Sequence, residues 1–524
     1  MKFPKVLIVI LILIFSWSLC AKAQDKNKKH SSVRIPENRV WYVTDFGAKG
    51  DGLTLNTSAI QKAIDACYRA GGGMVRFTRG TFISGTLFLK DNVTVHLDAD
   101  AVLMGSRNRQ DYQPITGLLT VEGKPSFGAG GSFLIYTENA KHISIEGRGE
   151  INGNGDTFWE EEMFTKWVRK PREWRPRSLI CFVNCKFIII RDIQLNNSPC
   201  YTLWPLGCDD INIEGVTIRN PLDGPNTDGI DIDCCRRVSI SNCNIEGGDD
   251  AIAIKSDSGR LGQEERPCEN IVVTNCILSS PPACAIRVGY EGDSPIRNAT
   301  FSNLAMYSSN HGIDIISILP DRGDDFPIIR GTRVENIQFD NIVMQDVTQP
   351  IYLWMGNDKK DIESSCFMRN IRISNLIATS GGTSFIGSTM EKYIENINLS
   401  NINIIPSGKV QKDQPLEVTV WNSESSCALY VANVKGLNVE GFSVDFSNAG
   451  GFWTHAVYCN SSRDVVLSNI LTNSLGTVKL ISQIGAVNSS LRVRNCNPED
   501  GIELIYSDDN SRVITTGCNE EKTN

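Results

Sequence analysis

A short strand motif recurs along most of this 524-residue chain. In each copy a polar residue, often Asn or Asp, precedes an apolar–x–apolar triplet, which is followed by a polar residue and then by Asn or Gly. Alternation of Val and Ile with polar residues predicts strands, and a long, regular period predicts a solenoid. Copies follow one another at intervals of about 22–38 residues and include residues 91–95, 141–145, 210–215, 237–242, 270–275, 336–341, 370–375, 396–401 and 464–469.

The fold class follows from the way these strands are joined. Gly and Asn turn the chain between them and no helix intervenes, which indicates an all-β fold built as a single-stranded parallel β-helix. An antiparallel sandwich is the alternative, but it would not repeat one strand motif so regularly. The asparagines are expected in left-handed backbone at the turns, where their side chains can hydrogen-bond from coil to coil.

The N-terminal part carries the one convincing helix signal. Residues 59–67 read as a helix that Thr57 or Ser58 can cap and that ends before three glycines at 71–73. Because the open end of a solenoid needs a cover, we expect this short helix to cap the β-helix.

The first residues have the features of a secretory signal. Lys2 and Lys5 precede the apolar run 6–15, and an A-x-A cleavage site lies at 21–23. The run is too short to favour a membrane span, and a lipid anchor at Cys20 is disfavoured by the large residue before it. We therefore expect an exported protein, periplasmic or extracellular. The predicted division is a signal peptide over 1–23, a flexible segment over 24–40, a β-helix catalytic domain over 41–515 and a tail over 516–524.

Composition excludes some partners. The net charge is −8, and removal of residues 1–23, which hold three lysines and no acid, leaves −11. Such a chain is a poor candidate for nucleic-acid binding. The 17 cysteines and five histidines show neither a small disulfide framework nor a zinc pattern, so we expect most cysteines to be buried free thiols and expect no metal and no cofactor.

Three aspartates fall in two neighbouring copies of the repeat. Asp228 belongs to the Pro-Asn-Thr-Asp-Gly stretch 225–229, and Asp249 and Asp250 follow one repeat later. Since successive coils are about 4.8 Å apart, the three carboxylates should meet on one surface. Clustered carboxylates repel one another and are typical of glycoside hydrolysis, although two ordinary Asp turns are the alternative.

This arrangement suits acid–base chemistry. Two carboxylates across a coil and a third displaced from them can hold a water on one side of a glycosidic bond and an acid on the other. Inverting hydrolysis uses a wide acid–base separation, roughly 6.5–9.5 Å. Crowding also raises the pKa of one carboxyl, as a general acid requires.

At this point the chain resembles glycoside hydrolase family 28, the polygalacturonase-like family, over nearly the whole mature chain to about residue 470. The segments that carry the resemblance are 45–52, 80–82, 175–177, 225–231 and 248–255. The resemblance implies a right-handed parallel β-helix and metal-independent, inverting hydrolysis. It also implies that Asp249 is the general acid and that Asp228 and Asp250 position and deprotonate the attacking water.

The sequence departs from the family pattern in two later coils. The family usually places Gly-His-Gly one coil after the aspartate pair, where this chain has Cys284. It usually places Arg-Ile-Lys a coil later, where residues 311–316 offer His311 and Asp314 but no basic pair. His311 lies one coil too far to be the missing histidine. A catalytic role for Cys284 is disfavoured, because no histidine is near it in sequence register.

Strand alternation suggests which residues replace the missing basic pair in binding a substrate carboxylate. With Ile230, Ile252, Ile286 and Ile313 pointing inward, one outward column would hold Asp231, Ala253, Arg287 and Asp314, and the next would hold Asp233, Lys255, Gly289 and Ile316. Arg287 would then face Asp314, and Lys255 would face Asp233. The alternatives are that these are surface ion pairs of little energetic value, or that the protein has lost its activity.

Residues 155–178 interrupt the repeat with tryptophans and basic residues. This loop either binds an acidic sugar chain or packs over the core. The residues assigned to substrate binding are Asn226, Lys255, Arg287, Asp314, His311 and Arg177. Together these features predict a secreted, monomeric polygalacturonase-type glycosidase that acts on a pectic, uronate-containing polysaccharide.

Three other functions stay open. A rhamnogalacturonan or substituted-pectin hydrolase would not need the basic pair. A pectate-lyase-like eliminase would need calcium carboxylates and a basic residue. A tailspike-type carbohydrate-binding β-helix would have no use for clustered aspartates.

Overall fold

The computed structural model describes residues 39–518 apart from 116–119, 122–123, 126–130, 322–327, 360, 411–416, 419–422 and 475–477, and it gives only the backbone of the short strands at 120–121, 124–125, 409–410, 417–418 and 423–424. The expected signal peptide over 1–23, nearly all of the segment 24–40 and most of the tail lie outside the described residues. The first described strand is β1 (Val40–Tyr42) and the last is β44 (Arg512–Thr516). The predicted domain limits stay predictions.

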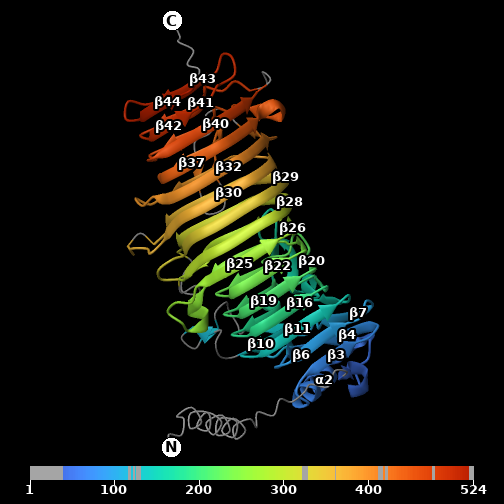
Figure 1. Cartoon of the computed structure of the whole chain (residues 1–524). Coiled ribbons are helices and arrows are strands. Elements are labelled where there is room, and N and C mark those ends of the chain that lie inside the picture. The colour runs from blue at the N-terminus through green and yellow to red at the C-terminus, as the bar shows by residue number, and fades with distance from the viewer. Residues whose placement is uncertain are drawn as a thin grey trace, which may run out of the picture.

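Parallel strands stack coil upon coil along one elongated solenoid (Figure 1). Each strand pairs with the equivalent strand of the next coil, as β18 does with β21 and β21 with β24. The predicted right-handed parallel β-helix is confirmed. The first face contains β10 (Phe133–Glu138), β15 (Ser178–Val183), β18 (Tyr201–Leu206), β21 (Ile230–Asp233), β24 (Ile252–Ser256) and β27 (Cys284–Gly292). The second contains β11 (Lys141–Gly147), β16 (Lys186–Arg191), β19 (Asp209–Glu214), β22 (Arg236–Ser241) and β25 (Cys268–Thr274). The third contains β12 (Glu150–Asn152), β17 (Gln194–Asn196), β20 (Thr217–Arg219), β23 (Asn244–Glu246) and β26 (Ile277–Ser279).

The coils at either end differ in strand length. Several strands after β27 continue through the corners and so belong to more than one face. The N-terminal coils contain β2 (Asp51–Leu55), β3 (Gly73–Phe77), β4 (Gly80–Ser84), β5 (Leu87–Phe88), β6 (Val93–Leu97) and β7 (Ala101–Gly105). The C-terminal coils contain β28 (Pro295–Leu319), β29 (Arg333–Asn357), β30 (Phe367–Ser380), β31 (Ser384–Ser388), β32 (Ile394–Pro406), β36 (Cys427–Ala432), β37 (Val434–Asp445), β39 (His455–Asn460), β40 (Val465–Asn473), β41 (Ser482–Val487), β42 (Ser490–Arg494) and β43 (Glu503–Ser507).

The apolar positions of the repeat fill the interior. On the second face Ile188, Ile211, Val238 and Ile271 stand in register on successive coils, and each is at most 3% exposed. Full burial of such a side chain stabilises a fold by about 1.5–3 kcal/mol. Ile190, Ile213, Ile240 and Val273 form a second buried column on this face, and such columns explain why the period-two pattern selects this solenoid.

Asparagines shape the turns, as predicted. Most of the non-glycine residues with positive φ are Asn, with values near 55°, a region that Asn tolerates better than most residues. Their side chains also bond between coils: the amide of Asn370 donates to Asn336 at 3.0 Å, and that of Asn396 donates to Asn370 at 2.7 Å. The turn residues thus hold neighbouring coils in register.

The N-terminal helix is α2 (Thr57–Arg69), and it packs Ile60, Ala63, Ile64 and Cys67 against the first coils. The predicted capping helix is confirmed, but the predicted cap is wrong. Asn56 occupies the N-cap without a side-chain bond to the helix, and the hydroxyl of Thr57 instead accepts the backbone N–H of Gly85 at 2.7 Å. Thr57 is therefore used to join the helix to the first coils.

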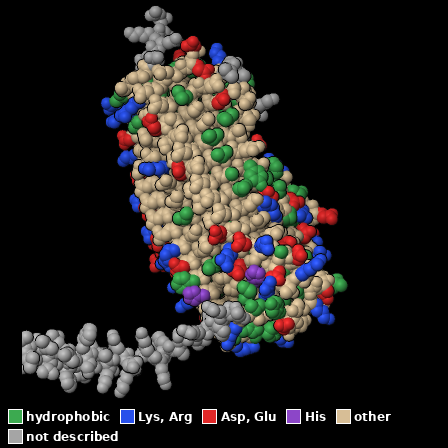
Figure 2. Space-filling model, turned by 45° about the vertical axis from the view of Figure 1, so that its right-hand side comes forward, with side chains coloured by type: hydrophobic (Ala, Val, Ile, Leu, Met, Phe, Trp, Pro, Cys, Tyr) green, Lys and Arg blue, Asp and Glu red, His purple; other side chains and the backbone are tan. Residues whose placement is uncertain are grey.

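The surface view shows acidic and basic side chains intermixed over the N-terminal half of the face that it presents (Figure 2). Among the described residues, no helix is both long and apolar enough to cross a bilayer.

Candidate active site

The three aspartates of the sequence motif lie at the start of two neighbouring strands. Asp228 precedes β21, and Asp249 and Asp250 precede β24, whose Ile252 is the register partner of Ile230. One carboxylate oxygen of each aspartate lies within 4.8 Å of one oxygen of each of the others. The nearest oxygens are thus closer than the wide separation expected for inversion, so the stereochemical outcome stays an implication of the family resemblance.

The two turns that present these aspartates pack directly on each other. The Thr227 hydroxyl accepts the N–H of Gly248 at 3.1 Å. A Cβ on Gly248 would lie 2.6 Å from the carbonyl oxygens of Pro221 and Gly224, so only glycine fits there. The local sequence Thr-Asp-Gly followed by Gly-Asp-Asp therefore brings the carboxylates together through backbone packing.

The loop of residues 155–178 holds the first of these turns. Arg175 donates to the carbonyl of Pro199 at 3.1 Å, to the carbonyl of Pro225 and to the Asn226 side chain at 2.7 Å. Asn226 itself has a left-handed backbone, with φ 54°. Asn226 is one of the residues predicted to bind substrate, and its amide oxygen accepts a hydrogen bond from Arg175.

The same loop packs over the core in part, and its binding of an acidic sugar chain stays a prediction. Trp159 is 2% exposed and its indole N–H donates to Pro199, and Trp174 packs on Tyr112 and Phe158. Trp167, in contrast, is 54% exposed. Part of the loop therefore covers the core, and part faces outward.

Asp250 is held at both oxygens. The backbone N–H of Cys284 donates to Oδ1 at 3.1 Å, and Nε of Arg287 donates to Oδ2 at 2.8 Å. Arg287 is 4% exposed, and its Nη1 lies 3.4 Å from Oδ1 of Asp314. Arg287 faces Asp314 in register, as predicted, but it also contacts Asp250.

Asp249 and Asp228 sit in an environment that favours their neutral forms. Burial, followed by repulsion from Asp228 and Asp250, raises the pKa of Asp249 well above its usual range. Burial also raises the pKa of Asp228 to about 6, although Lys255 opposes the shift. The site therefore keeps protons to higher pH than isolated aspartates would.

Lys255 contacts a different partner from the one predicted. Its backbone pairs with Asp233, but its ammonium lies 2.8 Å from Asp231 and 3.4 Å from both Asp228 and Glu291. Asp233 instead accepts the backbone N–H of Asp257 at 2.8 Å. The long, flexible lysine stem reaches along its own face to the carboxylate of Asp228.

These ion pairs are not on the surface. Lys255, Asp231, Arg287 and Asp314 are each at most 4% exposed, so the alternative that they are weak surface pairs is wrong. Burial by itself lowers the pKa of Lys255, but the surrounding carboxylates, Asp231 foremost, raise it well above its usual range. The lysine is therefore charged.

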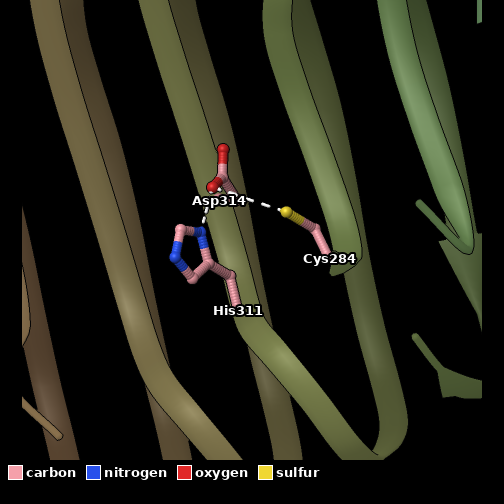
Figure 3. A group of neighbouring side chains, drawn as sticks. All are labelled: Cys284, His311 and Asp314. Carbon is pink, nitrogen blue, oxygen red and sulfur yellow. Dashed lines mark hydrogen bonds and ion pairs between the residues drawn. The ribbon is translucent and has the colours of Figure 1, made fainter. Parts of the chain in front are cut away.

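Cys284, His311 and Asp314 form a second cluster (Figure 3), with Cys284 one coil beyond Asp250 and the other two residues one coil further. Cys284 is the register partner of His311, so the expectation that no histidine lies near Cys284 is wrong. His311 Nδ1 bonds to Asp314, and the Cys284 sulfur lies 3.5 Å from the same carboxylate. Burial nevertheless raises the pKa of the Cys284 thiol well above its usual range, which disfavours a thiolate nucleophile.

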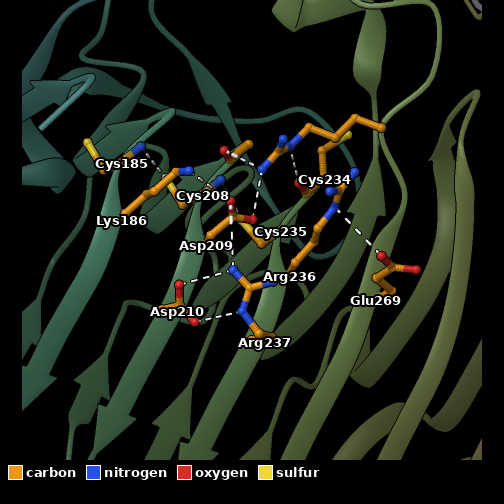
Figure 4. Close-up of polar contacts among 12 residues, drawn as sticks. Cys185, Lys186, Cys208, Asp209, Asp210, Cys234, Cys235, Arg236, Arg237 and Glu269 are labelled. Atoms are coloured by element: carbon orange, nitrogen blue, oxygen red, sulfur yellow. Dashed lines mark hydrogen bonds and ion pairs between the residues drawn. The ribbon is translucent and has the colours of Figure 1, made fainter. Parts of the chain in front are cut away.

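The other cysteines are structural. Every cysteine that the structure describes is a free thiol, and all but Cys518 are buried. Cys185, Cys208 and Cys235 stack at one turn of three coils, where the Cys185 N–H donates to the Cys208 sulfur at 3.3 Å and the Cys208 N–H donates to Cys235 at 3.4 Å (Figure 4). The prediction of buried free thiols is confirmed for these residues.

Within the part of the chain that the structure describes, two groups of side chains bring potential metal-ligand atoms together: the aspartate trio and the cluster of Cys284, His311 and Asp314. In each group a cation of the protein is already in contact with the carboxylates, Lys255 with Asp228 and Arg287 with Asp314. The compensating positive charge is therefore supplied by side chains, and we assign neither group to a metal.

Sequence reasoning missed two members of the site. Tyr201 lies in the coil before Asp228, with its ring centroid 4.2 Å from the Lys255 nitrogen and 5.4 Å from the Arg177 guanidinium. Glu291 reaches Lys255 from the end of β27, beyond an irregularity in the pairing of β24 with β27. Strand alternation could have placed Tyr201 beside Asp228, but an irregular register hides Glu291 from any periodic argument.

Two family models match the chain. One, for glycosyl hydrolases family 28, matches residues 99–428, and one for rhamnogalacturonase A/epimerase, pectate lyase-like proteins matches residues 41–109. A probable polygalacturonase of Vitis vinifera is 30% identical over 314 residues, which are 59% of this chain and 63%, just under two thirds, of that protein. An endo-polygalacturonase of Pectobacterium carotovorum subsp. carotovorum is 26% identical over 68% of this chain and 85% of its own length.

Solved structures share the fold. A family 28 exopolygalacturonase of Yersinia enterocolitica has a TM-score of 0.61 at 20% identity, over 91% of this chain and 78% of its own. An exopolygalacturonase of Thermotoga maritima has a TM-score of 0.59 at 23% identity, over 71% of this chain and 88% of its own. At these identities the likeness concerns the β-helix itself.

Proposed function

This chain belongs to family 28 of the glycosyl hydrolases, and we propose that it hydrolyses glycosidic bonds of a pectic polysaccharide with Asp249 as general acid and with Asp228 and Asp250 as the pair that activates water. The observation that carries the assignment is that the neighbouring residues Asp249 and Asp250 lie in contrasting environments. Burial and crowding favour the protonated form of Asp249, whereas Asp250 accepts hydrogen bonds at both oxygens, one of them from a guanidinium.

The reaction follows from these roles. Asp249 gives its proton to the oxygen of the scissile bond, so that the leaving sugar departs with a hydroxyl group. Asp228 and Asp250 orient one water, and one of them takes a proton from it as the water oxygen bonds to the anomeric carbon. Asp249 ends as a carboxylate and the base ends protonated, and exchange with solvent restores both.

Substrate binding is proposed for residues around Tyr201. Arg177 and Lys255 both lie against its ring, so this corner can attract a uronate carboxylate. Arg287, Asp314 and His311, also predicted to bind substrate, are almost fully buried and contact one another. Lys255 is just as buried, at 4% exposed, and is held by three carboxylates, so we place the sugar contacts chiefly at Asn226 and Arg177.

A rhamnogalacturonan or substituted-pectin backbone is the second candidate. Asp314 and Ile316 occupy the register where the family resemblance leads one to expect a basic pair, and a neutral sugar needs no cation there. The N-terminal match to the rhamnogalacturonase A/epimerase model points in the same direction.

Reducing-end release from a panel of pectic fractions tests the proposal. We expect release from at least one of homogalacturonan, methyl-esterified pectin and rhamnogalacturonan, by the wild type and not by Asp249→Asn. Ultraviolet-absorbing unsaturated products that depend on calcium would instead support the eliminase. Binding without bond cleavage would support a carbohydrate-binding β-helix. Export, to the periplasm or the medium, and a monomeric state are part of the same proposal.

A further inference from the structure

Arg287 links the catalytic trio to the second cluster. Its Nε donates to Asp250 at 2.8 Å, its Nη1 lies 3.4 Å from Asp314, and its Nη2 contacts the Cys284 sulfur at 2.9 Å. The side chain comes from β27, in register between Ala253 on one coil and Asp314 on the next. One buried guanidinium therefore touches three groups on three coils.

The far side of this arginine is itself fixed. Asp314 is fully buried, and its other oxygen bonds to Nδ1 of His311. The His311 ring packs against Tyr352 on the following coil, with ring centroids 4.6 Å apart. A series of side-chain contacts, from His311 to Asp314 to Arg287, thus connects the packed interior at β28 and β29 with the carboxylate of Asp250.

We propose that Arg287 is a positioning residue of the hydrolysis, which holds the carboxylate of Asp250 in the orientation that serves the attacking water and is itself held by Asp314 and His311. The inference rests on the proposed function. Nε of Arg287 and the N–H of Cys284 bind one oxygen of Asp250 each, so the carboxylate cannot rotate while both bonds persist. Neither bond involves the side chain of Asp249.

A direct grip on a substrate carboxylate fits the contacts less well. To reach a sugar, the guanidinium would have to leave Asp250 and Asp314, and each would then be a buried carboxylate without its cation, which is strongly unfavourable. A purely structural ion pair fits less well too, because one of its partners belongs to the catalytic trio.

Three variants test the role by kinetics as a function of pH. Arg287→Met removes both the positive charge and the N–H donors of the guanidinium. Arg287→Lys keeps the charge but cannot hold two carboxylates in the same geometry. Arg260→Met is the matched control. Arg260 is 2% exposed and pairs with Asp257 at 2.6 Å, so this variant removes a buried guanidinium bound to a carboxylate outside the trio. The charged and titratable groups that surround Arg287 and the trio are Asp228, Asp249, Lys255, Cys284, Tyr290, His311, Asp314 and Tyr352.

For Arg287→Met we expect kcat to fall at least tenfold, with KM changed less than threefold. The acidic limb of the pH–rate profile, on which the base loses its proton, should move to higher pH by about one unit, because a nearby positive charge is lost. Arg287→Lys should keep the limb near its wild-type position and still lower kcat. Arg260→Met should lose thermal stability and keep the profile unchanged.

Three results would overturn the inference. The first is a rise in KM confined to uronate substrates with an unmoved pH profile, which indicates a substrate clamp. The second is an Arg287→Met profile that matches Arg260→Met, which indicates a structural pair. The third is a wild type inactive on every pectic fraction, which removes the proposed function and this role with it. If Arg287→Met does not fold, Arg287→Lys decides: kcat and pH profile both equal to wild type would count against positioning.

Discussion

The ammonium of Lys255 lies 3.4 Å from Oδ2 of Asp228 and so supplies the trio with a charge from the same face of the solenoid. Asp231 and Glu291 share this cation at 2.8 Å and 3.4 Å. Burial alone would raise the pKa of Asp228, and the charge of Lys255 is what opposes that shift. Lys255 therefore keeps a buried carboxyl within reach of ionisation near neutral pH.

Asp249→Asn should remove the proton donor and leave the coil intact. Because Asn cannot protonate the leaving oxygen, we expect kcat to fall by about 10²–10⁴-fold, with little change in circular dichroism. The matched control is Asp210→Asn on the second face, where the backbone is left-handed at φ 59° and tolerates Asn. Near-normal turnover by a folded Asp249→Asn protein would mean that another residue is the acid.

The pH dependence of kcat/KM should be bell-shaped. Asp228 has its pKa raised to about 6, so the pair that activates water should gain activity as the pH rises through about 6. Asp249 must keep its proton, and its pKa is raised well above the usual range, so the falling limb should lie at higher pH than the rising limb. Rates measured between about pH 4 and 10 check both limbs, and full activity at pH 4 would contradict the assignment.

Much of the fold could be predicted because its determinants are local and repeated. Val and Ile at alternate positions mark strands, Asn marks each turn, and the 22-residue spacing of Asp228 and Asp250 places them one coil apart. The register of Arg287 with Asp314 followed from the same counting. These features depend on neighbours in sequence or on one coil period.

The contacts of the long side chains could not be predicted in this way. Counting places Lys255 beside Asp233, but its four-carbon stem carries the charge to Asp231 and Asp228 instead. Glu291 joins the site only because the β24–β27 pairing shifts before it. Backbone register predicts which residues are neighbours, whereas burial and charge decide which of them the ends of long side chains reach.

Asp228→Asn should stabilise the protein at neutral pH while it inactivates it. The pKa of Asp228 is raised from 3.8 to about 6 in the folded protein, so the folded state binds more protons than the unfolded state between these values, and stability falls as the pH rises through that window. Asn carries no such penalty, and Lys255 keeps Asp231 and Glu291 as partners. The free energy of unfolding should rise by about 1–3 kcal/mol at pH 7 and by much less at pH 4.

Urea denaturation of Asp228→Asn and wild type at both pH values measures this difference. The expected sign is a higher midpoint for the variant at pH 7. A lower midpoint at pH 7 would show that Asp228 is ionised at net benefit to the fold, and that its bond to Lys255 outweighs its burial.

Arg175 should matter for activity because it fixes the turn that precedes Asp228. It ties the loop of residues 155–178 to the turn before Asp228 through Pro225 and Asn226. Arg175→Ala leaves these acceptors without a charged donor, which costs about 1.5–3 kcal/mol of stability per such bond, and it lets the turn shift. A displacement on the order of 1 Å at a reacting group can lower a rate about 100-fold, so we expect kcat to fall by about 10–100-fold.

The matched control is Arg172→Ala in the same loop. Arg172 and Glu160 lie 3.8 Å apart and both side chains are about half exposed, so this variant should keep both activity and melting temperature. Equal kcat in the two variants would show that the turn keeps Asp228 in place without Arg175.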